Sequence, residues 1–291
     1  VSGAITRRRS SAQDQLTGSL NYDMNIPQRN GLKPFKWVPL MKRLQDSEFF
    51  YLPSTLRYRL QFTRQLRDQQ DFSAVAGDTL DVIRTDTESF NLNENYEIKF
   101  LPFRSLTTNY KIAITRDLRE SLQFSGLQFG HEIGRTQTVT AGFTPKLFRW
   151  LTTNTQYNAN YRENVETGGQ RTPVGNARRG LTATMQNQAS VRVGFNLPAL
   201  LRPLVRKGSI LGLVGKAGSA VSNVNTQIAR TKSFNTFGLR GRPSLAYQLG
   251  FSDSAQVEQF GGQSLTRTPT SNITDRADVG ASLRLPLGLS L

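Results

Sequence analysis

LTATMQNQASVRVGFNL, residues 181–197, alternates apolar and polar side chains, with Asn187 the one polar residue in the apolar set. Its odd-numbered positions run from Leu181 through Val193 to Leu197, and its even-numbered positions hold no large apolar residue. Successive side chains of a strand point to opposite faces of the sheet, so this pattern predicts a strand with one apolar and one polar face. A usual strand has about 5–6 residues, and about 9–11 tilted residues cross a bilayer. The stretch is therefore long enough to cross a membrane and protrude from it.

The same alternation recurs along the chain and predicts about ten strands with no long helix. The clearest further examples are residues 20–26, 56–62, 96–100, 106–114, 139–143, 151–161, 245–251 and 279–285, and residues 224–228 are a weaker one. Short links at 101–105 and 144–149 leave room only for hairpins, so 93–100 should pair with 106–114. We expect long loops near 64–90, 116–134, 162–179, 198–222 and 253–275.

No apolar run approaches the eighteen or so residues that a membrane helix needs. If the chain lies in a membrane, it must cross as strands, because only helices and closed barrels satisfy their backbone groups in lipid. We therefore expect an all-β fold, an antiparallel up-and-down sheet that forms part of a large transmembrane β-barrel. The chain begins at Val1 and ends inside an alternating run, so we expect residues 1–291 to be a fragment of one such domain.

Composition narrows the function classes. The chain has no cysteine and a single histidine, His131, and carboxylates such as Asp68 and Asp71, or Asp275 and Asp278, stand in expected loops without a histidine. We expect no catalytic residue, no cofactor and no metal site, and hence no enzyme. The net charge of +16 is compatible with nucleic acid, anionic lipid or a charged conduit. Its basic residues are scattered, which weakens the nucleic-acid interpretation.

The alternation assigns side chains to the two faces of a barrel wall. Placing the apolar set against lipid puts a group of basic residues in the lumen: Arg57, Arg59, Lys99, Lys111, Arg192 and Arg284. The residues that we expect to face lipid are Leu56, Tyr58, Leu60, Phe62, Val191, Val193 and Phe195.

Three blocks together resemble a known family. The first is KPF at 33–35 followed by FYLPSTLRYRLQFTRQLRD at 50–68. The second is NYEIKF at 95–100 with FRSLTTNYKIAIT at 103–115, and the third joins VTAGFTP at 139–145 to WLTTNTQYNANY at 150–161. In this order they are similar to the SprA/Sov family, the very large outer-membrane translocon of the type IX secretion system, which is also linked to gliding motility.

The resemblance implies a wall segment of a protein-conducting channel in the cell outer membrane, which exports folded proteins to the cell surface. It implies membrane lipid, secreted cargo proteins, a small shuttle barrel and a plug protein as partners, and no nucleic acid. Two alternatives stay open. One is a stand-alone outer-membrane porin or receptor barrel, and the other is a soluble basic β-protein that binds nucleic acid.

Overall fold

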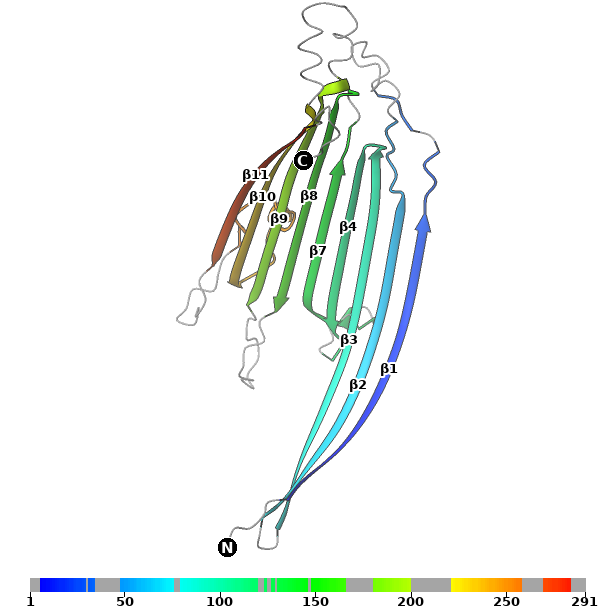
Figure 1. Ribbon diagram of the computed structural model, residues 1–291. Coiled ribbons are helices and arrows are strands. Elements are labelled where there is room, and N and C mark those ends of the chain that lie inside the picture. The colour runs from blue at the N-terminus through cyan, green and yellow to red at the C-terminus, as the bar shows by residue number, and fades with distance from the viewer. Residues whose placement is uncertain are drawn as a thin grey trace, which may run out of the picture. The chain divides into compact units, whose positions relative to one another are not determined.

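The computed structural model describes residues 6–29, 31–34, 48–75, 79–119, 123–124, 127–128, 130–145, 148–165, 180–199, 221–257 and 269–283. These residues form a nine-stranded sheet and a separate two-stranded one (Figure 1). The strands of the large sheet are β1 (Thr6–Asn25), β2 (Thr55–Val75), β3 (Thr79–Phe103), β4 (Leu106–Asp117), β7 (His131–Phe143), β8 (Leu151–Val165), β9 (Leu181–Asn196), β10 (Val221–Leu239) and β11 (Thr270–Leu283). The short strands β5 (Gln123–Phe124) and β6 (Leu127–Gln128) pair with each other.

Each strand of the large sheet lies beside its neighbour in sequence, in the order β1-β2-β3-β4-β7-β8-β9-β10-β11. Neighbours are antiparallel, which confirms the expected all-β, up-and-down sheet. The expected hairpin is also present, because β3 lies beside β4 and Thr108 donates a hydrogen bond to the Phe100 carbonyl at 2.9 Å. None of the helices among the described residues is long and apolar enough to cross a membrane.

The contacts divide the chain into two compact units, which we describe separately. The first comprises Val1–Tyr22, Arg57–Tyr96 and Ala113–Arg135. It contains the polar parts of β2 and β3, where the long loop 64–90 was expected; that prediction is wrong. Cross-strand ion pairs hold this stretch, with Arg64 2.9 Å from Glu88 and Arg84 3.1 Å from Asp68. Charged cross-strand pairs stabilise an antiparallel pair without any apolar face, so alternation could not reveal these strands.

Other expected loops are shorter than predicted where the structure describes them. β7 begins at His131 inside the expected loop 116–134, and β8 continues to Val165 inside the loop 162–179. β10 begins at Val221 and β11 at Thr270, so the loops 198–222 and 253–275 also end earlier. Residues 166–179, 200–220 and 258–268 lie outside the described residues.

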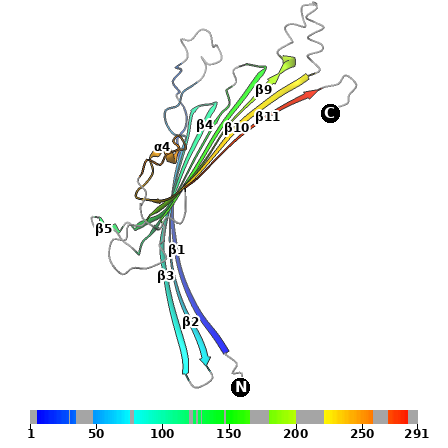
Figure 2. The ribbon, with the colours of Figure 1, turned by 90° about the vertical axis from the view of Figure 1, so that its left-hand side faces the viewer.

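The second unit comprises Asp23–Leu56, Glu97–Ile112 and Thr136–Leu291. It corrects the strand that we expected at 245–251. Leu245–Gln248 is instead the short helix α4, whose N-cap Ser244 accepts a hydrogen bond from the Tyr247 backbone N–H. A side-chain acceptor at this position satisfies a free helical N–H, and Gly250 ends the turn with φ of +78°. Seen from the side, α4 lies against one face of the sheet rather than among its strands (Figure 2).

The hydrophobic core of this unit forms beneath α4. Tyr161 of β8, Ala183 and Met185 of β9, Leu239 of β10 and Tyr247 of α4 are all at most 1% exposed. The Tyr161 and Tyr247 rings meet edge to face at 6.3 Å between centroids. Burial of two aromatic rings and a methionine contributes several kcal/mol, so α4 and the adjoining residues 240–257, the covering segment, are held firmly on the sheet.

Gly250 offers a test of how the covering segment is held. Gly250→Ala would place a Cβ 2.6 Å from the Tyr157 hydroxyl and 2.7 Å from the Asn187 Nδ2, in a left-handed conformation that costs about 1–2 kcal/mol. We expect a loss of at least about 1 kcal/mol in the free energy of unfolding, measured by denaturant titration of the purified protein. Gly280→Ala is the matched control, because nothing lies within 4 Å of its added Cβ. Equal stability of the two variants would contradict this packing.

Candidate functional site

A band without any charged side chain crosses one face of β8–β11 in the second unit. Directly opposed residues of antiparallel strands share a face, so the pairing gives its three rows. They are Leu151–Phe195–Val224–Ala281, Thr153–Val193–Thr226–Val279 and Thr155–Val191–Ile228–Ala277. Large apolar side chains are uncovered here: Val191 is 43% exposed, Ile228 59% and Val279 74%. We call these three rows the charge-free band.

Aromatic side chains lie at one end of the charge-free band. Trp150, which precedes β8, stacks on Phe195 of the first row with 6.3 Å between ring centroids. Phe148 stacks in turn on Trp150 at 5.2 Å. Aromatic rings of this kind gather where a barrel wall leaves the hydrocarbon, because one end of the ring is apolar and the other tolerates water.

Charge returns in the row at the other end of the band. This row contains Tyr157, Ala189, Arg230 and Asp275. Arg230 donates two hydrogen bonds to Asp275, at 2.6 and 2.7 Å. Tyr157 stacks on Phe251 of the covering segment, with 5.5 Å between centroids and 10° between the ring planes. An ion pair and an aromatic pair therefore mark this boundary.

Beyond the boundary row the same face is covered by the chain itself. The side chains of Tyr161, Ala183 and Met185 continue the apolar set of β8 and β9 and are buried under α4. Asn187 donates a hydrogen bond to the Gly250 carbonyl at 2.6 Å, and Tyr157 donates one to the Leu249 carbonyl. The apolar set of residues 181–197 is thus in two parts, one covered and one uncovered.

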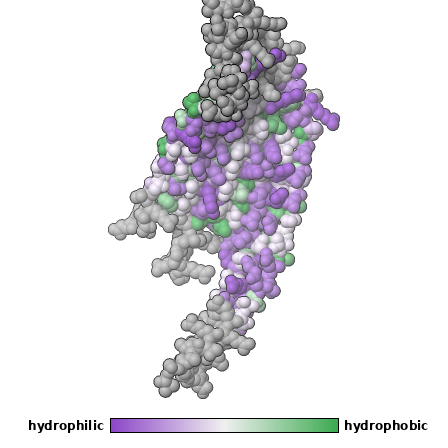
Figure 3. All heavy atoms as spheres, in the orientation of Figure 1, coloured by the Kyte–Doolittle hydropathy of each residue, from purple (hydrophilic) through white to green (hydrophobic). Residues whose placement is uncertain are grey.

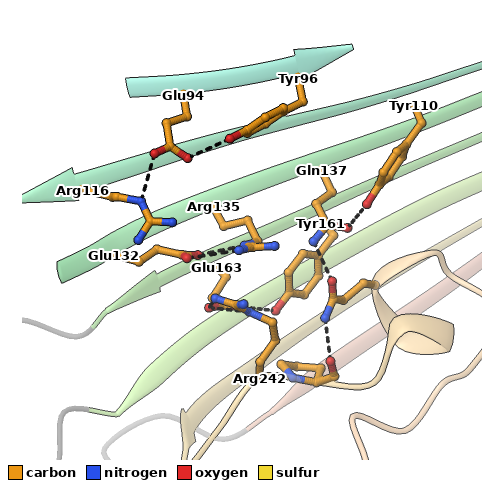
Figure 4. A network of polar contacts seen from close by, with 12 residues as sticks. Glu94, Tyr96, Tyr110, Arg116, Glu132, Arg135, Gln137, Tyr161, Glu163 and Arg242 are labelled. Carbon is orange, nitrogen blue, oxygen red and sulfur yellow. Dashed lines mark hydrogen bonds and ion pairs between the residues drawn. The ribbon is translucent and has the colours of Figure 1, made fainter. Parts of the chain in front are cut away.

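A chain of hydrogen bonds fixes the covering segment to two more strands. Tyr110 of β4 donates to the Gln137 Oε1 at 2.9 Å, and the Gln137 Nε2 donates to the Gln248 Oε1 at 2.6 Å. The Gln248 Nε2 then donates to the Pro243 carbonyl at 2.6 Å. Both glutamines are buried, and a buried amide without a partner is costly, so this connected chain favours one position of the segment (Figure 4).

A buried carboxylate provides the second polar attachment. Glu163 is 4% exposed. It accepts a hydrogen bond from the Tyr161 hydroxyl at 2.6 Å and forms an ion pair with Arg242 at 3.2 Å. Burial, together with the adjacent Glu163 carboxylate, raises the pKa of the Tyr161 phenol well above its ordinary value. The phenol therefore stays protonated and acts as a donor at neutral pH.

The first unit has its own polar group, also drawn in Figure 4. Glu94 accepts a hydrogen bond from the Tyr96 hydroxyl at 3.2 Å and lies 3.3 Å from the Arg116 Nε. Arg135 is paired with Glu132 at 2.8 Å. All five side chains belong to strand residues, and the carboxylates are paired with guanidinium groups as partly buried charges require.

The residues expected in the lumen lie on the polar set of the strands. Lys99 and Lys111 lie 3.9 and 3.5 Å from the same Glu97 carboxylate, and Arg192 donates to the Gln227 Oε1 at 2.6 Å. Arg57 and Arg59 are exposed on β2. Arg284 lies outside the described residues. The face seen in Figure 3 is mainly hydrophilic where the chain is described.

The residues expected to face lipid fall into two groups. Val191, Val193 and Phe195 belong to the charge-free band. Leu56, Tyr58, Leu60 and Phe62 alternate with the exposed Arg57, Arg59 and Gln61 along β2 and are half-buried. The structure therefore keeps each group on one face of its strand. Whether lipid covers them stays a prediction.

The sequence analysis missed Glu163, Arg242, Gln137 and Gln248. Glu163 could have been recognised, because it is a charged residue at a position of β8 where the alternation places apolar side chains. A charged side chain on that face requires a partner. Arg242 and Gln248 could not be paired with it or with Gln137 before the course of 240–257 was known. Among the described residues, no group of three or more His, Asp and Glu side chains is arranged to hold a metal ion.

The sequence was compared with protein-family models and with curated proteins, and neither comparison finds a match. The class that the structure defines is therefore a structural one: an all-β chain built on an up-and-down antiparallel sheet, with a charge-free band on one face.

Glu163→Gln tests the buried ion pair. It leaves the Arg242 guanidinium without its carboxylate, although Arg242 is 40% exposed and regains some hydration. We expect the free energy of unfolding to fall by about 1–3 kcal/mol and cleavage of 240–257 by protease to become faster. The double variant Glu163→Gln/Arg242→Gln should recover part of this loss. Arg230→Gln, which breaks the exposed pair with Asp275, is the control and should change stability much less. A larger effect at Arg230 would contradict the assignment.

Proposed function

We propose that the chain is a wall segment of a large β-barrel in the outer membrane, a channel that exports folded proteins by type IX secretion. The observation that carries the proposal is the charge-free band on a sheet of sequential antiparallel strands. In water a band of uncovered valine, isoleucine and phenylalanine invites aggregation, whereas in a membrane lipid covers it.

The height of the band fits within a membrane. From the Phe195 row to the boundary row of Tyr157 and Ala189, β9 runs over residues 189–195, which is fewer than the about 9–11 tilted residues that cross a bilayer. Trp150 and Phe148 at one end and Tyr157 and Phe251 at the other resemble the two aromatic girdles of such barrels.

The described strands do not close an antiparallel barrel by themselves. The described sheet has nine strands, with β1 and β11 at its edges. Because neighbours alternate in direction, these two edges run the same way and cannot pair antiparallel with each other. An all-antiparallel barrel then needs an odd number of further strands beside those described.

The polar face suits the lining of an aqueous passage. Lys99 and Lys111 on this face lie close to the Glu97 carboxylate, whereas a nucleic-acid site would gather its cations in one basic patch. The blocks that resemble the SprA/Sov family supply the rest of the proposal: transport rather than catalysis, secreted cargo, a shuttle barrel and a plug as partners, and the outer membrane as location.

Arginine substitutions on the two opposite faces of β9 test the membrane crossing. Val193→Arg puts a cation in the middle row of the band, and we expect a cost of about 2–4 kcal/mol and loss of assembly in the outer membrane. Gln188→Arg, on the opposite face of the same strand, should assemble normally. The measurement is heat-modifiable migration and outer-membrane recovery of each variant. Equal tolerance would contradict a lipid-facing wall, and failure of Gln188→Arg alone would mean that the two faces are inverted.

Depletion tests the secretion role. If the channel carries type IX cargo, cells depleted of the protein should accumulate proteins bearing the type IX signal in the periplasm and lose them from the surface. Immunoblots of periplasmic and surface fractions measure this. A stand-alone porin would instead leave the cargo distribution unchanged while altering small-solute uptake, and that result would reject the secretion role.

A further inference from the structure

The position of the covering segment relative to the charge-free band follows from β9 alone. Met185 and Val193 are eight residues apart on one strand, so they lie on the same face. Met185 is buried against Tyr247, whereas the neighbouring Val191 is uncovered. If Val193 faces lipid, the segment 240–257 must lie on the outer, lipid side of the wall and not in the lumen.

The height of the segment follows from strand geometry. Antiparallel strands rise about 3.4 Å per residue and tilt by about 40° in such barrels, so one residue is about 2.6 Å of membrane height. Tyr157 pairs with Ala189, four residues from Val193, and thus lies about 10 Å above or below it. The apolar band of a barrel is about 25 Å tall, so Phe251 on Tyr157 is near its edge when Val193 is central. Met185, at about 20 Å, is beyond the hydrocarbon.

The segment presents large apolar side chains on its outer side. Leu245 is 66% exposed and Phe251 71%, while Tyr247 between them is buried. The two come from one turn, in which the Phe251 N–H donates to the Ala246 carbonyl at 2.8 Å. This turn buries its tyrosine in the sheet and leaves a leucine and a phenylalanine largely exposed, although Phe251 also stacks on Tyr157 and the exposed Asp253, which pairs with Lys232, follows two residues later.

We propose that residues 240–257 form a ledge on the outside of the barrel that rests in the interfacial zone of the membrane, with Phe251 inserted among the lipids at the headgroup–acyl boundary. The inference rests on the proposed function, because it takes the charge-free band to face lipid. Phe251 is the main anchor, since it extends the aromatic level begun by Tyr157. The ledge also covers Tyr161 and Met185, which lie too far along the strands for lipid to do so.

Single-tryptophan variants of the full chain in lipid vesicles test the ledge. With Trp37 and Trp150 replaced by phenylalanine, tryptophan is placed at Phe251, at Val193 and at Gln188 in turn. The vesicles contain phospholipid brominated either near the headgroup or deep in the acyl chain, because bromine quenches only nearby tryptophan. We expect the Phe251→Trp emission to fall mainly with shallow bromine, the Val193→Trp emission mainly with deep bromine, and the Gln188→Trp emission with neither.

The outcomes separate the ledge from the proposed function. Quenching of Val193→Trp without any quenching of Phe251→Trp would overturn the ledge and leave the barrel wall intact, with water or a partner protein on the segment. Deep bromine acting on Phe251→Trp as strongly as on Val193→Trp would also overturn it, because the segment would then be buried in hydrocarbon. No quenching of Val193→Trp would overturn the proposed function itself. Circular dichroism of each variant checks that the strands form.

Discussion

The constraint on which the second unit depends is the length of its apolar stripe. Along β9 the apolar set runs over residues 181–195, whereas a bilayer covers only about 9–11 tilted residues. Under the proposed function lipid covers the part around Val193, and the rest must be buried by protein. The covering segment 240–257 does this by placing Tyr247 on Met185 and Tyr161. Under this proposal, one face of β9 is covered by lipid around Val193 and by the covering segment around Met185.

Covering the stripe with a loop buries polar groups, and the structure supplies each with a partner. Gln137 and Gln248 bond to each other and then to Tyr110 and the Pro243 carbonyl. The Glu163 carboxylate meets Arg242 and the Tyr161 hydroxyl. An unpaired amide or carboxylate here would cost more than the burial of one apolar side chain gains. These bonds thus select one docked position, while the hydrophobic core supplies most of the stability.

The alternation of apolar and polar residues predicted the strands that have one apolar and one polar face. It did not predict strands that lack this difference between their faces. The strands at 151–161 and 181–197 were predictable because each carries a stripe of apolar side chains on one face. The long β2–β3 pair was missed around Arg64 and Glu88, since both of its faces are polar there and ion pairs provide the pairing energy. Residues 245–251 also alternate, yet they form α4. In this turn Tyr247 is buried, whereas Leu245 and Phe251 are exposed. Which of the three side chains is buried depends on the sheet face against which the turn packs, and the sequence alone does not show that face.

The polar face follows a different requirement. A passage for folded proteins needs a wall that water wets but that does not bind the cargo, and isolated cations would hold acidic surfaces. Lys99 and Lys111 share the Glu97 carboxylate, which offsets one of their two positive charges, whereas Arg192 donates a hydrogen bond to the uncharged Gln227 and keeps its full charge. The sharing leaves an excess of one positive charge in the Lys99 cluster. Under the proposed function, such partial neutralisation keeps the lumen basic enough to stay hydrated while weakening its attraction for any single cargo.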